Sequence, residues 1–291
     1  MKIQLEEAVP EQASQIGRIF YHAFKNIMEQ HGLEPDIPSE EVGTAIMSAR
    51  IGTPECQGFV ALVDGRVAGA NFYARFDSVA AVGPMIVDPA MQGLGLGRKL
   101  MQAAIDHAQS HGFERVRLLQ DAINMVSMSL YTSLGFTVQE PIVLLRAAEK
   151  PEPVSGVRPL RLEDVEACSR LGIKLLGISR ANEVRFMISH GPGMGVIPVG
   201  LERAGELQGY AVPGFSGHGV AHTNDDLLAL VNTGMALSEG PSSAKWLCPS
   251  RNGDLFRMAL EQGHRAVRGL HLMSIGPYET PSGSWFSSIE G

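Results

Sequence analysis

The feature that most constrains this chain is a glycine-rich turn between an apolar run and a helical pattern. The run Met85-Ile86-Val87 precedes glycines at positions 93, 95 and 97, and apolar residues then recur at helical spacing. This pattern predicts a strand, a tight loop and a helix N-terminus. Such a loop presents unpaired N–H groups, and the helix dipole adds positive charge, so the site favours a phosphate or pyrophosphate. Arg98 in the first helical turn suits the same ligand.

Three kinds of anion-binding loop can be compared with this turn. A P-loop needs Gly-Lys followed by Ser or Thr, which the sequence lacks. A Rossmann loop needs G-x-G-x-x-G, whereas the glycines here alternate, which disfavours a nucleotide-binding oxidoreductase. The segment Gln92-Gly93-Leu94-Gly95-Leu96-Gly97, preceded by Val87-Asp88-Pro89, resembles the pyrophosphate loop of the GNAT superfamily of acyl-coenzyme A N-acyltransferases.

A second segment is similar to the same superfamily. Residues 124–136 read N-M-V-S-M-S-L-Y-T-S-L-G-F and match the pattern N-x-x-S-x-x-L-Y-x-x-x-G-F. Asn124 is typical of a helix N-cap and Gly135 of a helix end, while Leu130 and Leu134 are spaced to face a core. The resemblance implies that this helix lies along the coenzyme arm and that Tyr131 donates a proton to the departing thiolate; a core tyrosine is the alternative.

The order of predicted elements indicates an α/β protein with mixed sheets. Residues 1–148 read as a strand, two helices, three strands, a helix, a strand, a helix and a last strand. A proline-rich linker is predicted at 149–156, and residues 157–291 then repeat the same order. Asn252 and Gly263 reproduce the 11-residue spacing of Asn124 and Gly135. We therefore expect two tandem GNAT folds.

The second half departs from the family pattern where the chemistry would take place. It has no glycine loop, and Asp225-Asp226 stands near the start of the corresponding helix. Carboxylates at a helix N-terminus satisfy the dipole themselves and repel a pyrophosphate. Ala259 stands where Tyr131 stands in the first half. We expect residues 157–291 to be a degenerate, non-catalytic domain that stabilises the first or shapes its acceptor pocket.

The resemblance implies a coenzyme site in the first half. The pyrophosphate would lie on the glycine loop and Arg98, and the pantetheine arm along the strand that precedes the loop, with a backbone N–H near Val87 polarising the thioester. The expected coenzyme-binding residues are Met85, Ile86, Val87, Gln92, Gly93, Leu94, Gly95, Leu96, Gly97, Arg98, Asn124 and Ser127.

The general base and the acceptor site are less defined. Strand residues 79–84 carry no carboxylate, although many family members place a glutamate there. Asp121, at the end of the next strand, is the candidate base, or equally a cap of the following helix. His22, Glu29 and His31 lie in the segment that walls the acceptor cleft in the resembled fold; solvated helix-surface residues are the alternative.

Composition excludes several classes of function. A net charge of −7 gives no general attraction to nucleic acid. Three cysteines (56, 168 and 248), far apart and without a CxxC pair, indicate free thiols in a reducing compartment and no metal site. No run approaches the ~20 apolar residues of a membrane span. A cytoplasmic protein, monomeric or homodimeric, without a membrane or nucleic-acid partner is expected.

Together these observations favour an acetyl-coenzyme A-dependent N-acetyltransferase with no metal. The resemblance implies transfer of the acetyl group to a primary amine of a small molecule or peptide, by direct attack in a ternary complex. The alternative is a non-catalytic module that binds acyl-coenzyme A as a regulator or sensor.

Overall fold

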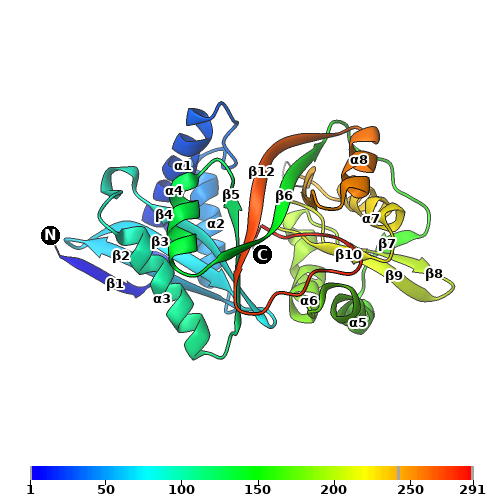
Figure 1. The fold of residues 1–291 in the computed structure, drawn as a ribbon, viewed down its shortest axis with the longest axis horizontal. Helices are drawn as coiled ribbons and strands as arrows, with labels where there is room; N and C mark the ends of the chain where they lie inside the picture. Colours follow the sequence, from blue (N-terminus) through cyan, green and yellow to red (C-terminus); the bar gives the residue numbers. More distant parts are fainter. Residues whose placement is uncertain (1, 241–242, 290–291) are drawn as a thin grey trace. The chain divides into compact units, whose positions relative to one another are not determined.

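A computed structural model describes residues 2–240 and 243–289 (Figure 1). The chain divides into two compact units. Unit 1 comprises Met1–Arg75, Val79–Leu118 and Ile123–Phe136, and unit 2 comprises Phe76–Ser78, Leu119–Ala122 and Thr137–Gly291.

Unit 1 is built on strands that follow one another in sequence order. They are β1 (Ile3–Glu7), β2 (Cys56–Val63), β3 (Arg66–Ala74), β4 (Val79–Val87) and the first part of β5 (Arg115–Asp121). Pairing is antiparallel from β1 to β4 and parallel between β4 and β5. The turn between β2 and β3 has Asp64 at φ 49° and Gly65 at φ 80°, which is the left-handed pair that the Asp-Gly signal predicts for a tight hairpin.

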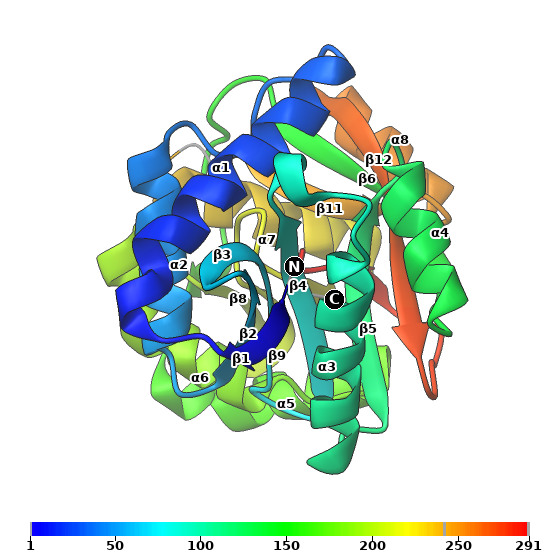
Figure 2. The same ribbon diagram turned by 90° about the vertical axis from the view of Figure 1, so that its left-hand side faces the viewer.

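The helices of unit 1 lie on both faces of these strands. They are α1 (Ala13–Gln30), α2 (Glu40–Gly52), α3 (Leu96–Ser110) and α4 (Met125–Ser133), which Figure 2 shows from the β1 side. Phe72 packs with Ile16 of α1 in one buried cluster, whereas the side chain of Asn71 donates to the backbone oxygen of Leu100 in α3. Because successive strand residues point to opposite faces, α1 and α3 cover opposite sides.

Unit 2 contains two groups of strands. Strands β7 (Val157–Pro159), β8 (Val199–Arg203), β9 (Glu206–Ala211), β10 (Gly219–Ala221) and β13 (Ser284–Phe286) lie in the order β13-β10-β9-β8-β7. Strands β6 (Thr137–Ala147), β11 (Lys245–Pro249) and β12 (His264–Ile275) form antiparallel pairs, with β6 between β12 and β11. The helices are α5 (Val165–Leu176), α6 (Ala181–His190), α7 (Asn224–Leu237) and α8 (Gly253–Glu261). Short 3-10 turns in the chain span Pro10–Gln12, Pro89–Met91, Leu162–Asp164 and Gly191–Met194.

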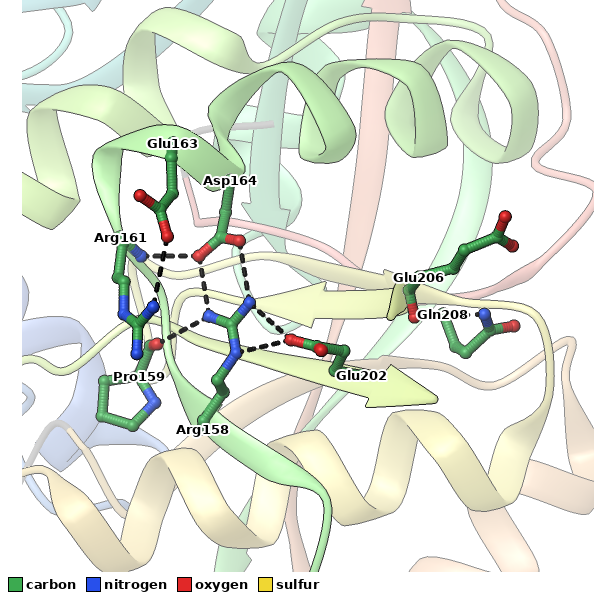
Figure 3. Close-up of polar contacts among 8 residues, drawn as sticks. All are labelled: Arg158, Pro159, Arg161, Glu163, Asp164, Glu202, Glu206 and Gln208. Atoms are coloured by element: carbon green, nitrogen blue, oxygen red, sulfur yellow. Dashed lines mark hydrogen bonds and ion pairs between the residues drawn. The ribbon is translucent and has the colours of Figure 1, made fainter. Parts of the chain in front are cut away.

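Hydrogen bonds from Arg158 hold the first strand of the second half in place (Figure 3). Arg158 of β7 donates to both carboxylate oxygens of Asp164, at 2.8 and 2.9 Å, and its Nε donates to Glu202 of β8 at 2.8 Å. Hydrogen bonds from the guanidinium lower the pKa of the Asp164 carboxyl below its usual range, because they favour the charged form. The short strand β7 is thereby held to both β8 and the turn that opens α5.

The last strands of the two halves of the sequence are exchanged. Strand β6, the last of the first half, pairs with β11 and β12, both from the second half. Strand β12 lies beside the end of β5, where the backbone N–H of Ala122 donates to the oxygen of Gly269 at 3.0 Å. Compact unit 2 therefore contains β6, whereas the division at residues 149–156 into two domains stays a prediction.

The predicted α/β class with a mixed sheet is confirmed by the parallel pair β4–β5, whereas the sheet β13-β10-β9-β8-β7 is antiparallel. The element order strand, two helices, three strands, helix, strand, helix, strand occurs twice along the chain, and β13 follows the second occurrence. One packing expectation was wrong: Leu130 and Leu134 are only partly buried, and Tyr131 and Phe136 are the buried residues of that segment.

Candidate functional site

The glycine loop of unit 1 has the conformation that its spacing predicts. Asp88 follows β4, and its Oδ1 accepts from the N–H of Ala90 at 2.9 Å to start the loop. Gly93 and Gly95 have φ of 80° and 76°, and Gly95 is the N-cap of α3. Apart from the adjacent residues in the chain, no atom in the described part of the protein lies within 4 Å of where a Cβ would stand at either glycine. The glycines are therefore needed for backbone conformation, and the loop faces open space.

Three elements named from the sequence meet at Gly97. A Cβ on this glycine would lie 3.4 Å from Cδ2 of Leu130 in α4, 3.6 Å from Cε of Met85 and 3.8 Å from Cγ2 of Val87 in β4. Arg98 also donates through Nη2 to the hydroxyl of Ser133 in α4 at 2.7 Å. The first turn of α3, the end of β4 and the α4 helix thus form one local arrangement.

Strand β4 leaves part of one edge unpaired among the described residues. Its parallel ladder with β5 covers only Val79–Ala81, opposite Arg115–Arg117, whereas its ladder with β3 continues to Val87. An unpaired strand edge exposes N–H and C=O groups that can pair with an extended ligand. Met85, Ile86 and Val87 lie on this part of β4, directly before the glycine loop.

The start of α4 confirms the predicted cap. The Oδ1 of Asn124 accepts from the N–H of Ser127 at 3.0 Å, and the hydroxyl of Ser127 donates to the backbone oxygen of Asn124 at 2.9 Å. Gly135 ends the helix region with φ 97°. Both Asn124 and Ser127 are therefore held at the N-terminus of the helix whose Leu130 contacts the Gly97 position.

Tyr131 lies one residue beyond Leu130 on α4. Its side chain is 8% exposed, and its ring centroid is 6.0 Å from that of Phe136. The ring is thus largely enclosed by the chain, which fits a core residue and also fits a phenol kept away from bulk water. Its role as an acid stays a prediction.

Asp121 lies in unit 2 and has a specific partner there. Its Oδ1 accepts from Nε of Arg268 in β12 at 2.5 Å, and the Arg268 side chain is only 4% exposed. The guanidinium also lies 5.8 Å from the ring centroid of Phe215. Since Asn124 caps α4, the alternative of Asp121 as that cap is wrong. Its role as a base stays a prediction.

The three proposed acceptor residues lie on the surface of α1 or at its end. His22 Nε2 is 2.8 Å from Glu40 Oε1, at the start of α2. Glu29 is 3.8 Å from the ammonium of Lys25, and His31 Nδ1 is 2.8 Å from the backbone oxygen of Ile27. Each side chain has a partner of its own, and these contacts do not gather the three into one cluster.

Two contacts were not anticipated from the sequence. Ser133 and Arg98 are 35 residues apart, and Arg268 and Asp121 are 147 apart. Neither pair has a local sequence signal, because each depends on how separate elements pack. Among residues 2–240 and 243–289, no group of three or more His, Cys, Asp or Glu side chains is placed to hold a metal ion. No helix in this described part is long and apolar enough to cross a membrane.

Residues 21–136, which include the glycine loop and α4, match the model of the acetyltransferase (GNAT) family. This part of the chain belongs to the GNAT acetyltransferases.

Curated relatives match a shorter part of the chain. The chain is 40% identical over 80 residues to a mycothiol acetyltransferase of Thermomonospora curvata, covering 27% of each chain. It is 52% identical over 68 residues to one of Kocuria rhizophila, covering 23% of this chain and 22% of the relative. The matches therefore span about a quarter of the length of these relatives.

Two solved structures resemble the whole chain. One, from Pyrococcus horikoshii and named provisionally as an acetyltransferase, covers 99% of this chain and 95% of its own, with a TM-score of 0.77 and 15% identity. A GCN5-related N-acetyltransferase from Sphaerobacter thermophilus covers 96% of this chain and 98% of its own, with a TM-score of 0.61 and 18% identity. At such identities the likeness concerns the fold alone.

Proposed function

We propose that this chain is an acetyl-coenzyme A-dependent N-acetyltransferase with its working site on the loop, β4 and α4 of unit 1. The observation that carries the proposal is the meeting of these elements at Gly97, where even a Cβ would contact Met85, Val87 and Leu130. The first turn of α3 is thereby close to both the unpaired edge of β4 and the helix that bears Tyr131.

The residues present suit a coenzyme with a pyrophosphate and an extended amide arm. Gly93 and Gly95 leave the loop N–H groups accessible, and Arg98, tied to Ser133, adds a positive charge. The edge of β4 at Met85–Val87 offers a row of backbone groups to the amides of the arm. A backbone N–H near Val87 would stabilise negative charge on the thioester oxygen during attack.

Acyl transfer then requires two proton movements. A neutral amine attacks the thioester carbonyl, the C–S bond breaks, and the thiolate must gain a proton. We assign that proton to the Tyr131 hydroxyl, because a phenol of ordinary pKa ~10 remains protonated at neutral pH and can act as an acid in an enclosed site. The ammonium form of the amine must first lose its proton, through water, with Asp121 as the candidate acceptor.

We propose a small-molecule amine as the acceptor, ahead of a peptide. The sequence relatives support a small-molecule acceptor, since they are named mycothiol acetyltransferases. His22, Glu29 and His31 remain the candidate acceptor-site residues, although each has a partner on the helix surface.

A non-catalytic sensor of acyl-coenzyme A is the competing proposal. The observation that favours it is the absence of any carboxylate in β4, which reads Val79-Ala80-Ala81-Val82-Gly83-Pro84-Met85-Ile86-Val87. In that proposal the loop binds coenzyme, and no acceptor reacts.

Calorimetric titration of the full chain with acetyl-coenzyme A, followed by mass spectrometry with a panel of small amines, tests the proposal. We expect one coenzyme per chain and a mass increase of one acetyl group on at least one amine. Binding without acetylation of any amine would favour the sensor, and no binding would contradict both proposals.

A further inference from the structure

In unit 2, strand β13 pairs with one edge of β10, whereas the corresponding edge of β4 in unit 1 is partly unpaired among the described residues. Strand β10 follows a hairpin and precedes a helix, as β4 does. One edge of β10 pairs with β9, and its other edge pairs with β13. The register of the second pair is Gly219 opposite Phe286, Val220 opposite Trp285 and Ala221 opposite Ser284.

The same C-terminal segment also reaches β11. The N–H of Ser287 donates to the oxygen of Leu247 at 3.2 Å, and these residues form a β-bridge. In element order, β10 and β11 correspond to β4 and β5, whose own ladder ends at Ala81. The segment therefore links β10 to β11 within unit 2, whereas the corresponding strands of unit 1, β4 and β5, are paired directly and only over Val79–Ala81.

Side-chain packing leaves little space around this segment. Phe286 is 2% exposed, and its ring centroid lies 5.8 Å from that of Trp246 in β11, at an interplanar angle of 85°. A Cβ at Gly219 would lie 2.3 Å from Cε1 of Phe286, and one at Gly283 would lie 2.8 Å from the oxygen of Ala221. The ring and backbone of the segment thus fill the space beside β10.

Further hydrogen bonds hold the segment at both ends. The N–H of Ser282 donates to the oxygen of Leu175 in α5 at 2.9 Å. After β13, the hydroxyl of Ser288 donates to the oxygen of Ser216 at 2.9 Å, and the N–H of Ile289 donates to that of Phe215 at 3.2 Å. The segment is therefore fixed by backbone pairing in the middle and by separate anchors on either side.

We propose that residues 283–289 act as an internal ligand of unit 2, in the strand-edge position that the pantetheine arm takes in unit 1. The comparison with pantetheine rests on the proposed function, whereas the closure of β10 by β13 does not. The segment seals this part of unit 2 against an extended amide ligand, so that the chain retains a single coenzyme site.

The test uses the full chain with a substitution that displaces Phe286. In Gly219→Ala the new methyl group collides with the Phe286 ring, whereas in Gly193→Ala it meets no atom within 4 Å in the part of the chain that the structure describes, its chain neighbours aside. Hydrogen–deuterium exchange should rise at least ten-fold in residues 219–221, 245–249 and 284–289 together in the first variant. The control variant should exchange like the parent chain.

A truncated chain ending at Ser282 supplies the second arm. We expect a lower Tm that a synthetic peptide of residues 283–289 raises again. A Tm that truncation leaves unchanged, or that the peptide does not raise, would overturn the proposal, as would a Gly219→Ala variant in which residues 284–289 alone exchange faster.

Calorimetry separates this proposal from the proposed function. Gly95→Val in the full chain should abolish binding of acetyl-coenzyme A. A remaining site in that variant would overturn the sealing of unit 2. If the parent chain binds no coenzyme, the proposed function fails, while the exchange and peptide experiments still decide whether residues 283–289 are an internal ligand.

Discussion

The side-chain amides of Asn224 and Asn252 donate hydrogen bonds to each other, at 3.3 Å and 2.9 Å. Asn224 is the first residue of α7, and Asn252 is the N-cap of α8, where its Oδ1 also accepts from the N–H of Leu255 at 3.1 Å. The starts of the two helices are therefore fastened together. In the first half α3 begins with Leu96, whose hydrocarbon side chain cannot make such a bond.

Replacing Asn252 tests its role as the N-cap of α8. Asn252→Ala should lower the free energy of unfolding by about 1 kcal/mol, because an N-cap is lost, and should leave the affinity for acetyl-coenzyme A unchanged. Asn124→Ala should lower the free energy of unfolding by a similar amount and should also lower the affinity for acetyl-coenzyme A. Urea unfolding and calorimetry measure both effects; weaker coenzyme binding in Asn252→Ala would show that unit 2 contributes to the coenzyme site.

Gly95 and Gly205 form a matched pair for the loop. They have φ of 76° and 78°, and among residues 2–240 and 243–289 no atom beyond the adjacent residues lies within 4 Å of either Cβ position. Alanine at either position should cost about 1 kcal/mol of stability, because the left-handed conformation disfavours a Cβ. Only Gly95→Ala should raise the Kd for acetyl-coenzyme A, by ten-fold or more in calorimetry. An equal Kd in the two variants would show that the loop is not part of the coenzyme site.

Tyr131 and Tyr210 allow a similar comparison for catalysis. Tyr131→Phe keeps the packing against Phe136 and removes the hydroxyl, so kcat should fall by about 10²-fold while coenzyme affinity is kept. The Tyr210 hydroxyl is buried without a hydrogen-bond partner in the described part of the chain. Tyr210→Phe should therefore leave kcat unchanged and stability equal or higher. Steady-state kinetics with an accepted amine would contradict the assignment if Tyr131→Phe turned over at the parent rate.

Stability should depend on pH through a buried histidine of unit 2. His218 is 1% exposed, with Nδ1 3.4 Å from Oε1 of Glu183. The other carboxylate oxygen of Glu183, Oε2, accepts from Nε of Arg180 at 2.7 Å. Burial, followed by repulsion from Arg180, lowers the pKa of His218 below its ordinary value of 6.5. The unfolded chain therefore binds more protons below pH 6.5, and stability falls as the pH decreases.

Urea unfolding between pH 7 and 5 checks this dependence. His218→Phe should flatten the loss of stability, although His264, whose pKa is also lowered by burial, keeps part of the slope. Replacement of the exposed His22 by Gln serves as control. Glu183 acts at lower pH: burial opposes its charge, but Arg180 and His218 outweigh it and lower its pKa to about 2, so further stability is lost below about 4.5. If the free energy of unfolding of His218→Phe depended on pH as steeply as that of the parent chain, the role of His218 would be refuted.

The sequence predicts most of the local structure of unit 1 and little of its long-range pairing. The Asp64-Gly65 hairpin, the Asn124 cap and the left-handed Gly93 and Gly95 follow from backbone requirements of individual residues, which act over a few positions. The contact between Asp121 and Arg268 depends on which strand lies beside β5, and residues 115–121 carry no signal that would choose β12.

The spacing of Leu130 and Leu134 predicted two core residues, and this prediction was wrong for a related reason. Leu130 lies against the Gly97 position at the start of α3, and yet its side chain, like that of Leu134, is only partly buried. Periodicity indicates which face of a helix is apolar, and it does not indicate how much of that face a neighbour covers.

Separating the halves at residue 148 tests the strand exchange. Residues 1–148 alone would contain β6 without β11 and β12, its partners on both sides. We expect this fragment to aggregate or to unfold with a Tm well below that of the full chain, because two long strand edges are exposed. Adding residues 149–291 during refolding should recover soluble complex; a stable, soluble fragment on its own would show that β6 can pair within the first half.

The position of β12 beside the end of β5 also has a consequence for synthesis of the chain. β5 ends at Asp121, and β12, the strand beside that end, begins at His264. A ribosome must therefore make more than a hundred further residues before that pairing is available. During this interval the nascent chain presents incomplete strand edges, for which long-range pairing is slow and chaperones compete. The pairing at the end of β5 is therefore completed only after β12 has been translated.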